Sequence, residues 1–291
     1  MKNIIYCLLI PIFITACSTN KNKRAPVRLA AIGIKGESIP QYTFRYDAGG
    51  HLVAIVQYLR ENDTSTISFR YDAHDRLTSM VTIDSSNQQH TIRQQARITA
   101  WDEAGNITAI QYYDGHCRPT RTAKVAWKGG WPSRLKYSDS SQAISWDSCD
   151  GNAAWKDLCT TTPSGKKTDT NIVLRSVRAE WDRSESPLRL LANQMLLGPA
   201  LSPVVHTAPF GYLPNMLLYV GANNPTLVKI TEKEKSVYPE KMLAYERSTT
   251  LQYFYDYHDN GYPATASVHL HTEGYTKLST DTRFTMDYTY E

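Results

Sequence analysis

The sequence predicts an all-β protein: an antiparallel meander of roughly a dozen strands, curled into an open or closed barrel, with one short helical and proline-rich apolar insertion. Three features support this prediction. A short aromatic-Asp-Gly pattern recurs along the chain, and polar and apolar residues alternate on both sides of it, as they do on strands. The chain also contains 19 Tyr against 6 Phe, and the polar tip of tyrosine suits strand faces that are only half buried.

The recurring unit is a strand that ends in an aromatic residue and is followed by Asp and by a turn containing Gly, Asn or Asp. The aromatic residues of successive units lie 25, 30 and 26 residues apart, a period typical of a structural repeat. Units of two strands joined by tight turns make an antiparallel meander. The first four aromatic residues are Tyr46, Tyr71 and Trp101, and Trp127 from a looser copy in which Lys128 stands in place of Asp.

The carboxylates that follow these aromatic residues have a structural explanation. An Asp side chain in such a position accepts hydrogen bonds from backbone N–H groups of its own turn. We therefore interpret these residues as turn formers rather than as the acid and base of a glycosidase. They are Asp47, Asp72, Asp102 and, in a late copy of the unit, Asp256.

Alternation indicates which side chains share a strand face. In residues 42–46, 67–71 and 284–290, aromatic and aliphatic residues occupy every second position. A large sheet accumulates twist and leaves edges that invite aggregation, so it tends to curl or close into a barrel. We expect the aromatic faces to line the inside of that barrel.

The pattern stops between residues 187 and 224. Residues 187–197 are predicted to form a short helix that starts at Pro187 and ends before Gly198-Pro199. The stretch after it is too apolar for a linker, and its prolines argue against a strand pair. Leaving the leucines of the helix in water would forfeit on the order of 10 kcal/mol, so we expect the insertion to plug or cover the inner face of the barrel.

Two arrangements of the insertion against the barrel agree with the sequence. Either a ligand pocket lies between the insertion and the aromatic strand face, or the insertion simply completes the core. A pocket of the first kind would be mostly apolar, with a few polar groups. The candidate ligand-facing residues are Phe44, Tyr46, Phe69 and Tyr71 from the strands and Tyr212 from the insertion.

The first 16 residues are predicted to be a cleavable export signal. Their apolar run, residues 4–14, is 11 residues long and too short for a membrane-spanning helix, which needs about 20. The run ends in Ile14-Thr15-Ala16-Cys17, which resembles a lipobox, so Cys17 is predicted to carry the lipid, with its palmitate chain. The alternative is an ordinary signal that is cleaved near Ala16.

Residues 17–26 are predicted to form a polar, flexible tether, and residues 27–291 a single β-rich domain. Ser18 does not resemble a signal for inner-membrane retention, and the acidic stretch typical of surface export is absent. We therefore expect a lipid anchor in the outer membrane, with the domain on the periplasmic face rather than on the cell surface.

Three cysteines, Cys117, Cys149 and Cys159, remain after the signal and the anchor. The oxidising compartment of an exported protein permits one disulfide among them. Cys149 and Cys159 are nearest in sequence and bracket the turn signal Asp150-Gly151-Asn152, so they are the predicted pair.

The sequence contains few residue patterns that are typical of catalytic or metal-binding sites. We find no nucleophile elbow, phosphate-binding loop or zinc-site spacing, and we predict a protein without enzymatic activity, metal or cofactor. His269 and His271 point the same way on a predicted strand but have no third metal ligand in the sequence. The balance of 32 Lys and Arg against 28 Asp and Glu gives no reason to expect nucleic-acid binding.

The lipobox, the Tyr-Asp hairpin units and the segment Gly211-Tyr212-Leu213-Pro214-Asn215 together resemble a family of Bacteroidota lipoproteins of unknown function that is described as having a porin-like fold. The resemblance spans most of the chain after the signal. It implies a fold and a compartment, but no activity and no functional residues. The hairpin units also resemble the Tyr-Asp repeats of large bacterial surface and toxin-shell proteins.

The predicted function is that of a non-catalytic cell-envelope lipoprotein. It would be held at the membrane by its lipid anchor and would bind an apolar or glycan ligand or an envelope protein partner. Two alternatives are kept. One is a membrane-embedded porin-like barrel, whose strands need about 9–11 residues. The other is an enzyme that acts on glycans.

Overall fold

The computed structural model describes residues 27–60, 63–139, 142–149, 152–161, 170–191, 204–207, 211–214, 221–274 and 280–291. Within these ranges nearly all regular structure is antiparallel strand, and the helical element is a single 3₁₀ turn, η1 (Arg189–Leu191). None of the helical structure in the described ranges is long and apolar enough to cross a membrane. The predicted all-β antiparallel meander is confirmed.

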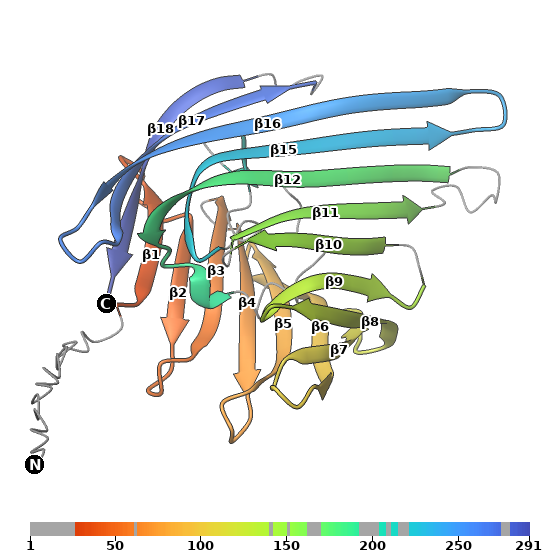
Figure 1. The fold of residues 1–291 in the computed structure, drawn as a ribbon, viewed down its shortest axis with the longest axis horizontal. Helices are drawn as coiled ribbons and strands as arrows, with labels where there is room; N and C mark the ends of the chain where they lie inside the picture. Colours follow the sequence, from red (N-terminus) through yellow and green to blue (C-terminus); the bar gives the residue numbers. More distant parts are fainter. Residues whose placement is uncertain are drawn as a thin grey trace, which may run out of the picture.

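The first half of the barrel consists mostly of short strands, which follow one another as hairpins (Figure 1). We call β2–β8 the repeat wall, because it contains the recurring unit. The strands of this half are β1 (Leu29–Ile34), β2 (Tyr42–Tyr46), β3 (Leu52–Arg60), β4 (Asp63–Tyr71), β5 (Leu77–Ser86), β6 (Gln89–Trp101), β7 (Ile107–Tyr113), β8 (Pro119–Lys128) and β9 (Trp131–Tyr137).

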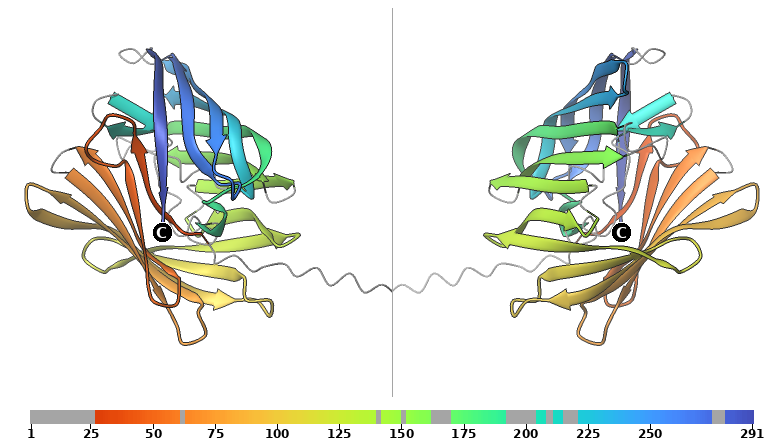
Figure 2. Two further views of the ribbon diagram at one scale, coloured as in Figure 1. Left: turned by 90° about the vertical axis from the view of Figure 1, so that its left-hand side faces the viewer. Right: turned by 90° about the vertical axis from the view of Figure 1, so that its right-hand side faces the viewer.

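The second half contains the longest strands, and β12 and β16 each have 16 residues. We call β12 and β15–β18 the long-strand wall; it lies across from the repeat wall in both views of Figure 2. The strands of this half are β10 (Gln142–Cys149), β11 (Asn152–Thr161), β12 (Thr170–Glu185), β15 (Asn223–Val237), β16 (Met242–Tyr257), β17 (Pro263–Glu273) and β18 (Thr280–Tyr290).

The strand order forms a ring, because β1 pairs with β2 on one side and with β18 on the other. The β1–β18 ladder runs from Leu29, opposite Tyr290, to Ile34, opposite Met286, and the backbone of Arg28 adds hydrogen bonds to Glu291 beyond it. The β1–β2 ladder has only two residue pairs. The barrel is therefore completed by a broad seam between the first and last strands and a narrow one between β1 and β2.

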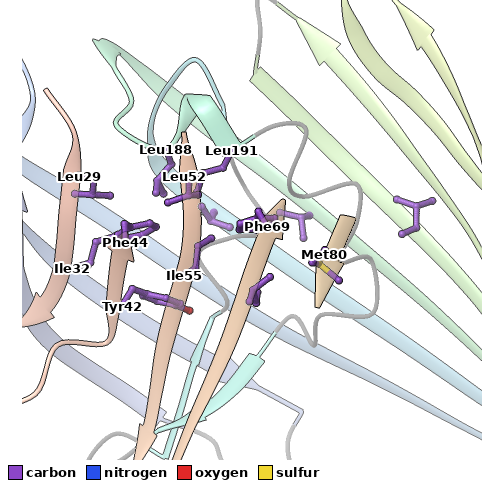
Figure 3. Packing of buried hydrophobic residues seen from close by; sticks show 14 of the residues in the cluster. Leu29, Ile32, Tyr42, Phe44, Leu52, Ile55, Phe69, Met80, Leu188 and Leu191 are labelled. Atoms are coloured by element: carbon purple, nitrogen blue, oxygen red, sulfur yellow. The ribbon is translucent and has the colours of Figure 1, made fainter. Parts of the chain in front are cut away.

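The predicted alternation is confirmed by the burial of the strands. Along β8, Ala123 and Val125 are buried and point inward, whereas Lys124 is exposed. On β9 the inward Leu135 is buried and the outward Lys136 is exposed. Figure 3 shows the same inward packing at β1–β5. Along these strands apolar side chains thus fill the inside of the barrel, and charged side chains lie on its outside.

The aromatic residue of the unit has a second role besides filling the core. In most units it donates a hydrogen bond to a backbone carbonyl at or near the start of the preceding strand, which ties the two strand ends together; Trp101 instead lies against the guanidinium of Arg76. Tyrosine and tryptophan can do this and phenylalanine cannot, which explains why Tyr or Trp occupies these positions. The donors and their carbonyls are Tyr46 to Leu29 (3.1 Å), Tyr71 to Leu52 (2.8 Å), Trp127 to Ile107 (2.7 Å), Tyr255 to Pro225 (3.0 Å) and Tyr290 to Pro263 (2.8 Å).

The Asp residues of the repeat wall form their turns as predicted. Asp72 accepts hydrogen bonds from the backbone N–H groups of His74 and Arg76 at 2.9 and 3.0 Å. Asp102 accepts one from Asn106 at 2.8 Å. The side-chain hydrogen bond from Arg76, together with these backbone donors, lowers the pKa of Asp72 to about 2.

The last turn of the barrel differs from the prediction. Here the backbone hydrogen bond that closes the turn starts at His258 and ends at Tyr262. Asp256 lies two residues earlier, inside β16, and accepts a hydrogen bond from Thr265 at 3.1 Å. The interpretation of Asp256 as a turn former is therefore wrong. Asp114, which forms the turn between β7 and β8 in the same way as Asp72, was not recognised in the sequence.

The insertion also differs from its prediction. Its described residues contain η1 in place of the first turns of a helix; residues 192–197 lie outside the described part of the chain. They also contain a two-stranded sheet, β13 (Val204–Thr207) and β14 (Gly211–Pro214), where the prolines argued against strands. Pro214 is the last residue of β14, and both strands of a two-stranded sheet are edge strands, where proline is tolerated.

The predicted disulfide is not compatible with the register of β10 and β11. Cys149 pairs with Asn152 at one end of this hairpin, and Cys159 pairs with Gln142 at the other. Seven residues of strand separate the two positions by about 23 Å, and a disulfide cannot join Cα atoms more than about 7 Å apart. Cys117 is free and exposed.

Candidate functional site

A cavity of about 190 Å³ lies at the end of the barrel where the turns of the first two units are found. Strand ends form one side of it, because β1 and β3 begin there and β2 and β4 end there. The start of the insertion forms the other side. The lining residues are Leu29, Phe44, Tyr46, Gly50, His51, Leu52 and Tyr71 from the strands and turns, and Pro187, Leu188 and Leu191 from the insertion.

The insertion reaches the cavity through a short, hydrogen-bonded turn. The backbone N–H of Leu188 donates to the hydroxyl of Ser186 at 3.2 Å, and that of Arg189 donates to the Ser186 carbonyl. Leu191 in turn donates to the carbonyl of Leu188 at 2.9 Å. This geometry turns Leu188 and Leu191 toward Leu52 and Phe44, as Figure 3 shows, and both leucines are buried.

The two ends of the insertion are held side by side at its root. The backbone N–H of Ser186 donates to the carbonyl of Ala222 at 2.9 Å. The carboxylate of Asp182 accepts hydrogen bonds from the backbone N–H groups of Ser184 and Asn224, both at 3.0 Å, and Asn224 is almost fully buried. The insertion therefore leaves and re-enters the barrel at a rigid point next to the cavity.

The tyrosine hydroxyls at the cavity are already engaged in the structure. Tyr46 and Tyr71 donate to the carbonyls of Leu29 and Leu52, as described above. Burial raises the pKa of Tyr46 to about 12, so its hydroxyl keeps its proton at neutral pH and is no general base. These two aromatic residues offer ring surface to a ligand rather than reactive groups.

His51 is the polar side chain at the cavity. Its Nδ1 lies 3.1 Å from the carboxylate of Asp47, and its Nε2 lies 3.5 Å from that of Asp75. The imidazole ring also stacks against Tyr71, with 4.9 Å between the ring centroids. Both ring nitrogens therefore face carboxylates of the two turns, and the imidazole is held as a fixed polar ring beside a mostly apolar surface.

Three of the five ligand-facing residues predicted from the sequence, Phe44, Tyr46 and Tyr71, line this cavity. Phe69 is buried in the core and does not line it. Tyr212 belongs to β14, but its side chain is outside the described part of the structure, and Cys17 is outside the described residues altogether.

His51 was not predicted from the sequence. The pattern that could have indicated it is the spacing of four residues from Asp47. This spacing places His51 at the end of the turn, immediately before β3. Leu29 and Leu52 were also overlooked. They have no signal of their own, because they enter the lining only as the first residues of β1 and β3.

The described residues contain no group of three or more His, Cys, Asp or Glu side chains that could hold a metal ion. The two histidines singled out in the sequence contact carboxylates instead. His269 lies 2.6 Å from Asp281, and His271 lies 3.0 Å from Glu273. The hydrogen bond to Glu273 raises the pKa of His271.

Comparison with known proteins gives a local and a global similarity. The family model of the RHS repeat matches residues 46–86, which contain the turns of Asp47 and Asp72. The crystal structure of a porin-like protein from Bacteroides uniformis is similar along 90% of this chain and 96% of that one, with 15% sequence identity and a TM-score of 0.44. No curated protein sequence matches the chain.

Proposed function

We propose that this protein is a non-catalytic, lipid-anchored protein of the bacterial cell envelope that binds a small apolar group in the cavity beneath η1. The lipid on Cys17 would hold it in the outer membrane, on the periplasmic face. The tether of residues 17–26 ends just before Leu29, which lines the cavity, so the binding site would lie close to the anchor.

The observation that carries this proposal is the composition of the cavity. Its walls are leucine side chains and aromatic rings, with His51 as the polar group, and this is the usual make-up of a small-molecule site. Whole-ligand pockets have volumes of about 300–1,000 Å³. A cavity of about 190 Å³ suits one apolar part of a larger molecule, such as a ring or the end of an acyl chain.

The sidedness of the strands supports a water-facing barrel over the porin-like alternative. Membrane-embedded barrels present an apolar band outward. In this protein the outward positions include exposed Lys124 and Lys136 on the repeat side and Lys229 and Lys233 on the long-strand side. The chain would reach the membrane through its anchor.

The carboxylates of the repeat support a non-catalytic role. Asp47, Asp72 and Asp102 accept hydrogen bonds from the N–H groups of their own turns. These hydrogen bonds lower the pKa of each carboxyl, so at neutral pH none of them holds a proton to give to a leaving group.

The cavity is tested by filling it. Leu188→Phe places a ring in the space beneath η1, while Leu174→Phe adds the same ring to an exposed position on β12 as a control. We expect the wild-type protein and Leu174→Phe to bind N-phenyl-1-naphthylamine with the same fluorescence increase, and Leu188→Phe to lose most of it. Leu191→Phe replaces Leu188→Phe should the latter not fold. Equal dye binding by all folded variants would overturn the proposal.

The anchor is tested separately in the native host. Cys17→Ser should abolish the incorporation of labelled palmitate and move the protein out of the membrane fraction. Unchanged labelling in this variant would show that the lipid is attached elsewhere or not at all, and would leave the test of the cavity unaffected.

A further inference from the structure

The outer face of the long-strand wall carries a second, larger hollow of about 500 Å³. It shares no residue with the cavity beneath η1. Three neighbouring strands contribute to it. Its lining residues are Gln252 and Phe254 from β16, Ser267, Val268 and His269 from β17, and Arg283, Phe284 and Thr285 from β18.

An exposed aromatic ring marks this hollow. Phe254 is 65% exposed, the largest exposure among the large hydrophobic side chains of the described residues. Its neighbours Tyr253 and Tyr255 point inward and join the core, so the Phe254 ring adds nothing to the packing of the barrel. Because this exposed ring lies in a hollow beside polar side chains, it can serve as the apolar contact for a ligand.

The strand register places polar side chains in two rows around this ring. Phe254 is opposite Ser267, which is opposite Thr285 on the next strand. One step along, Gln252 is opposite His269, which is opposite Arg283. The hollow therefore combines one flat apolar surface with hydrogen-bonding groups spread over three strands.

Within the described part of the chain, two of these polar side chains are available to a ligand. No described residue forms a hydrogen bond or an ion pair with the side chain of Arg283 or of Gln252. His269 is held in place by Asp281, at 2.6 Å from its Nε2. The Arg283 guanidinium is attracted by the nearby charge of Asp281 but forms no ion pair with a described carboxylate, so its N–H groups can bind an outside carboxylate.

We infer that this hollow is a binding site for an acidic glycan. The flat ring of Phe254 fits the apolar C–H face of a sugar, because an aromatic face carries negative charge and C–H groups are weakly positive. Gln252, His269 and Ser267 supply hydrogen bonds to hydroxyl groups. Arg283 supplies the planar pair of donors that matches the carboxylate of a uronic acid.

Binding of two hexasaccharides to the purified full-length protein in detergent tests this site. The probes are hyaluronan hexasaccharide, which carries carboxylates, and neutral chitohexaose, and the method is isothermal titration calorimetry. We expect the hyaluronan fragment to bind more tightly. Phe254→Ala should weaken both by roughly tenfold or more, and Arg283→Gln should weaken only the hyaluronan fragment, by about tenfold.

Two variants serve as controls. Met242→Ala removes another exposed apolar side chain from β16, and Arg178→Gln removes an exposed cation from β12; both lie outside the hollow and should bind as the wild type does. Leu188→Phe should also leave sugar binding unchanged, so that failure of the cavity beneath η1 and failure of this site are distinguishable.

Three outcomes would overturn the inference. One is that neither sugar binds the wild-type protein. Another is that Phe254→Ala and Met242→Ala weaken binding equally. The third is a dimer in analytical ultracentrifugation that Phe254→Ala dissociates, because the hollow would then be an interface between two copies of the chain.

Discussion

The short strands β7–β9 and the long strands β12, β15 and β16 differ in the residues that they direct toward the inside of the barrel. In β7–β9 the inward residues are apolar along nearly the whole strand; Ile110 and Leu135 are fully buried there. In the long strands, inward positions are apolar at one end and charged at the other. Val177, Val228 and Leu251 are buried, but the same face continues with Arg175, Glu232 and Arg247.

The charged end of the long strands is an ordered network. The carboxylate of Glu232 accepts a hydrogen bond from Arg175 and another from Arg247, each at 2.8 Å. Arg247 also lies 3.3 Å from Glu234. The apolar core therefore extends along only part of the long strands. Where strands extend past it, paired charges replace apolar side chains on the inward face.

The largest effect is expected from the core of the short strands. Leu135→Ala removes a fully buried side chain of β9 and should lower the free energy of unfolding by about 2–5 kcal/mol. Leu174→Ala, on the outward face of a long strand, removes a side chain that is 39% exposed and should cost less than about 0.5 kcal/mol. Urea unfolding followed by tryptophan fluorescence gives both values. Similar losses would mean that the core is not concentrated where the short strands lie.

A smaller effect is expected from the charged end of the long strands. Glu232→Gln leaves Arg175 and Arg247 without their shared carboxylate and should lower the free energy of unfolding by about 1–3 kcal/mol. Glu246→Gln breaks the pair with Lys233, whose side chains are both more than half exposed, and should cost no more than about 0.5 kcal/mol. The same urea titration compares them, and an equal loss would contradict the distinction between inward and outward ion pairs.

The smallest effect comes from the turns of the repeat wall and depends on pH. The pKa of Asp72 is lowered to about 2, whereas an unfolded Asp has a pKa of about 3.9. A depressed folded-state pKa stabilises the protein above the unfolded pKa, and this contribution disappears as the pH falls through the folded one. The wild-type protein should therefore lose more stability than Asp72→Ala between about pH 5 and pH 2.

Thermal unfolding at a series of pH values measures this difference. Glu103→Ala is a suitable control, because Glu103 is an exposed acid in the next turn that forms no hydrogen bond or ion pair with any described residue. Parallel pH curves for wild type and Asp72→Ala would show that the turn carboxylate does not contribute.

Local patterns in the sequence were sufficient for most strands and turns of the repeat wall, with the turn of Asp114 as the exception. Alternation around Phe44 and Phe69 and the Asp–Gly spacing after Tyr46 are properties of neighbouring residues, so no long-range information was needed. The same local alternation placed Tyr71 on the inward face, where it lines the cavity.

Features that depend on register or on distant partners could not be predicted. The separation of Cys149 from Cys159 follows from how β10 pairs with β11, and a turn signal between them does not determine that register. The aromatic hydroxyl bonds, such as Tyr71 to Leu52, join residues 19 positions apart. In the late unit an extra pair of residues moves the turn from Asp256 to His258, which only the pairing of β16 with β17 reveals.

The pairing of β1 with β18 has a consequence for the order of folding. A chain is synthesised from its amino terminus, so β1 emerges first, and its broad seam forms only after β18 has followed. Until then β1 is held by two residue pairs to β2 and exposes an open strand edge, the kind of surface on which chains associate wrongly. Joining segments so distant in sequence is slow. The first strand therefore keeps an open edge for the whole time that the chain needs to deliver the last one.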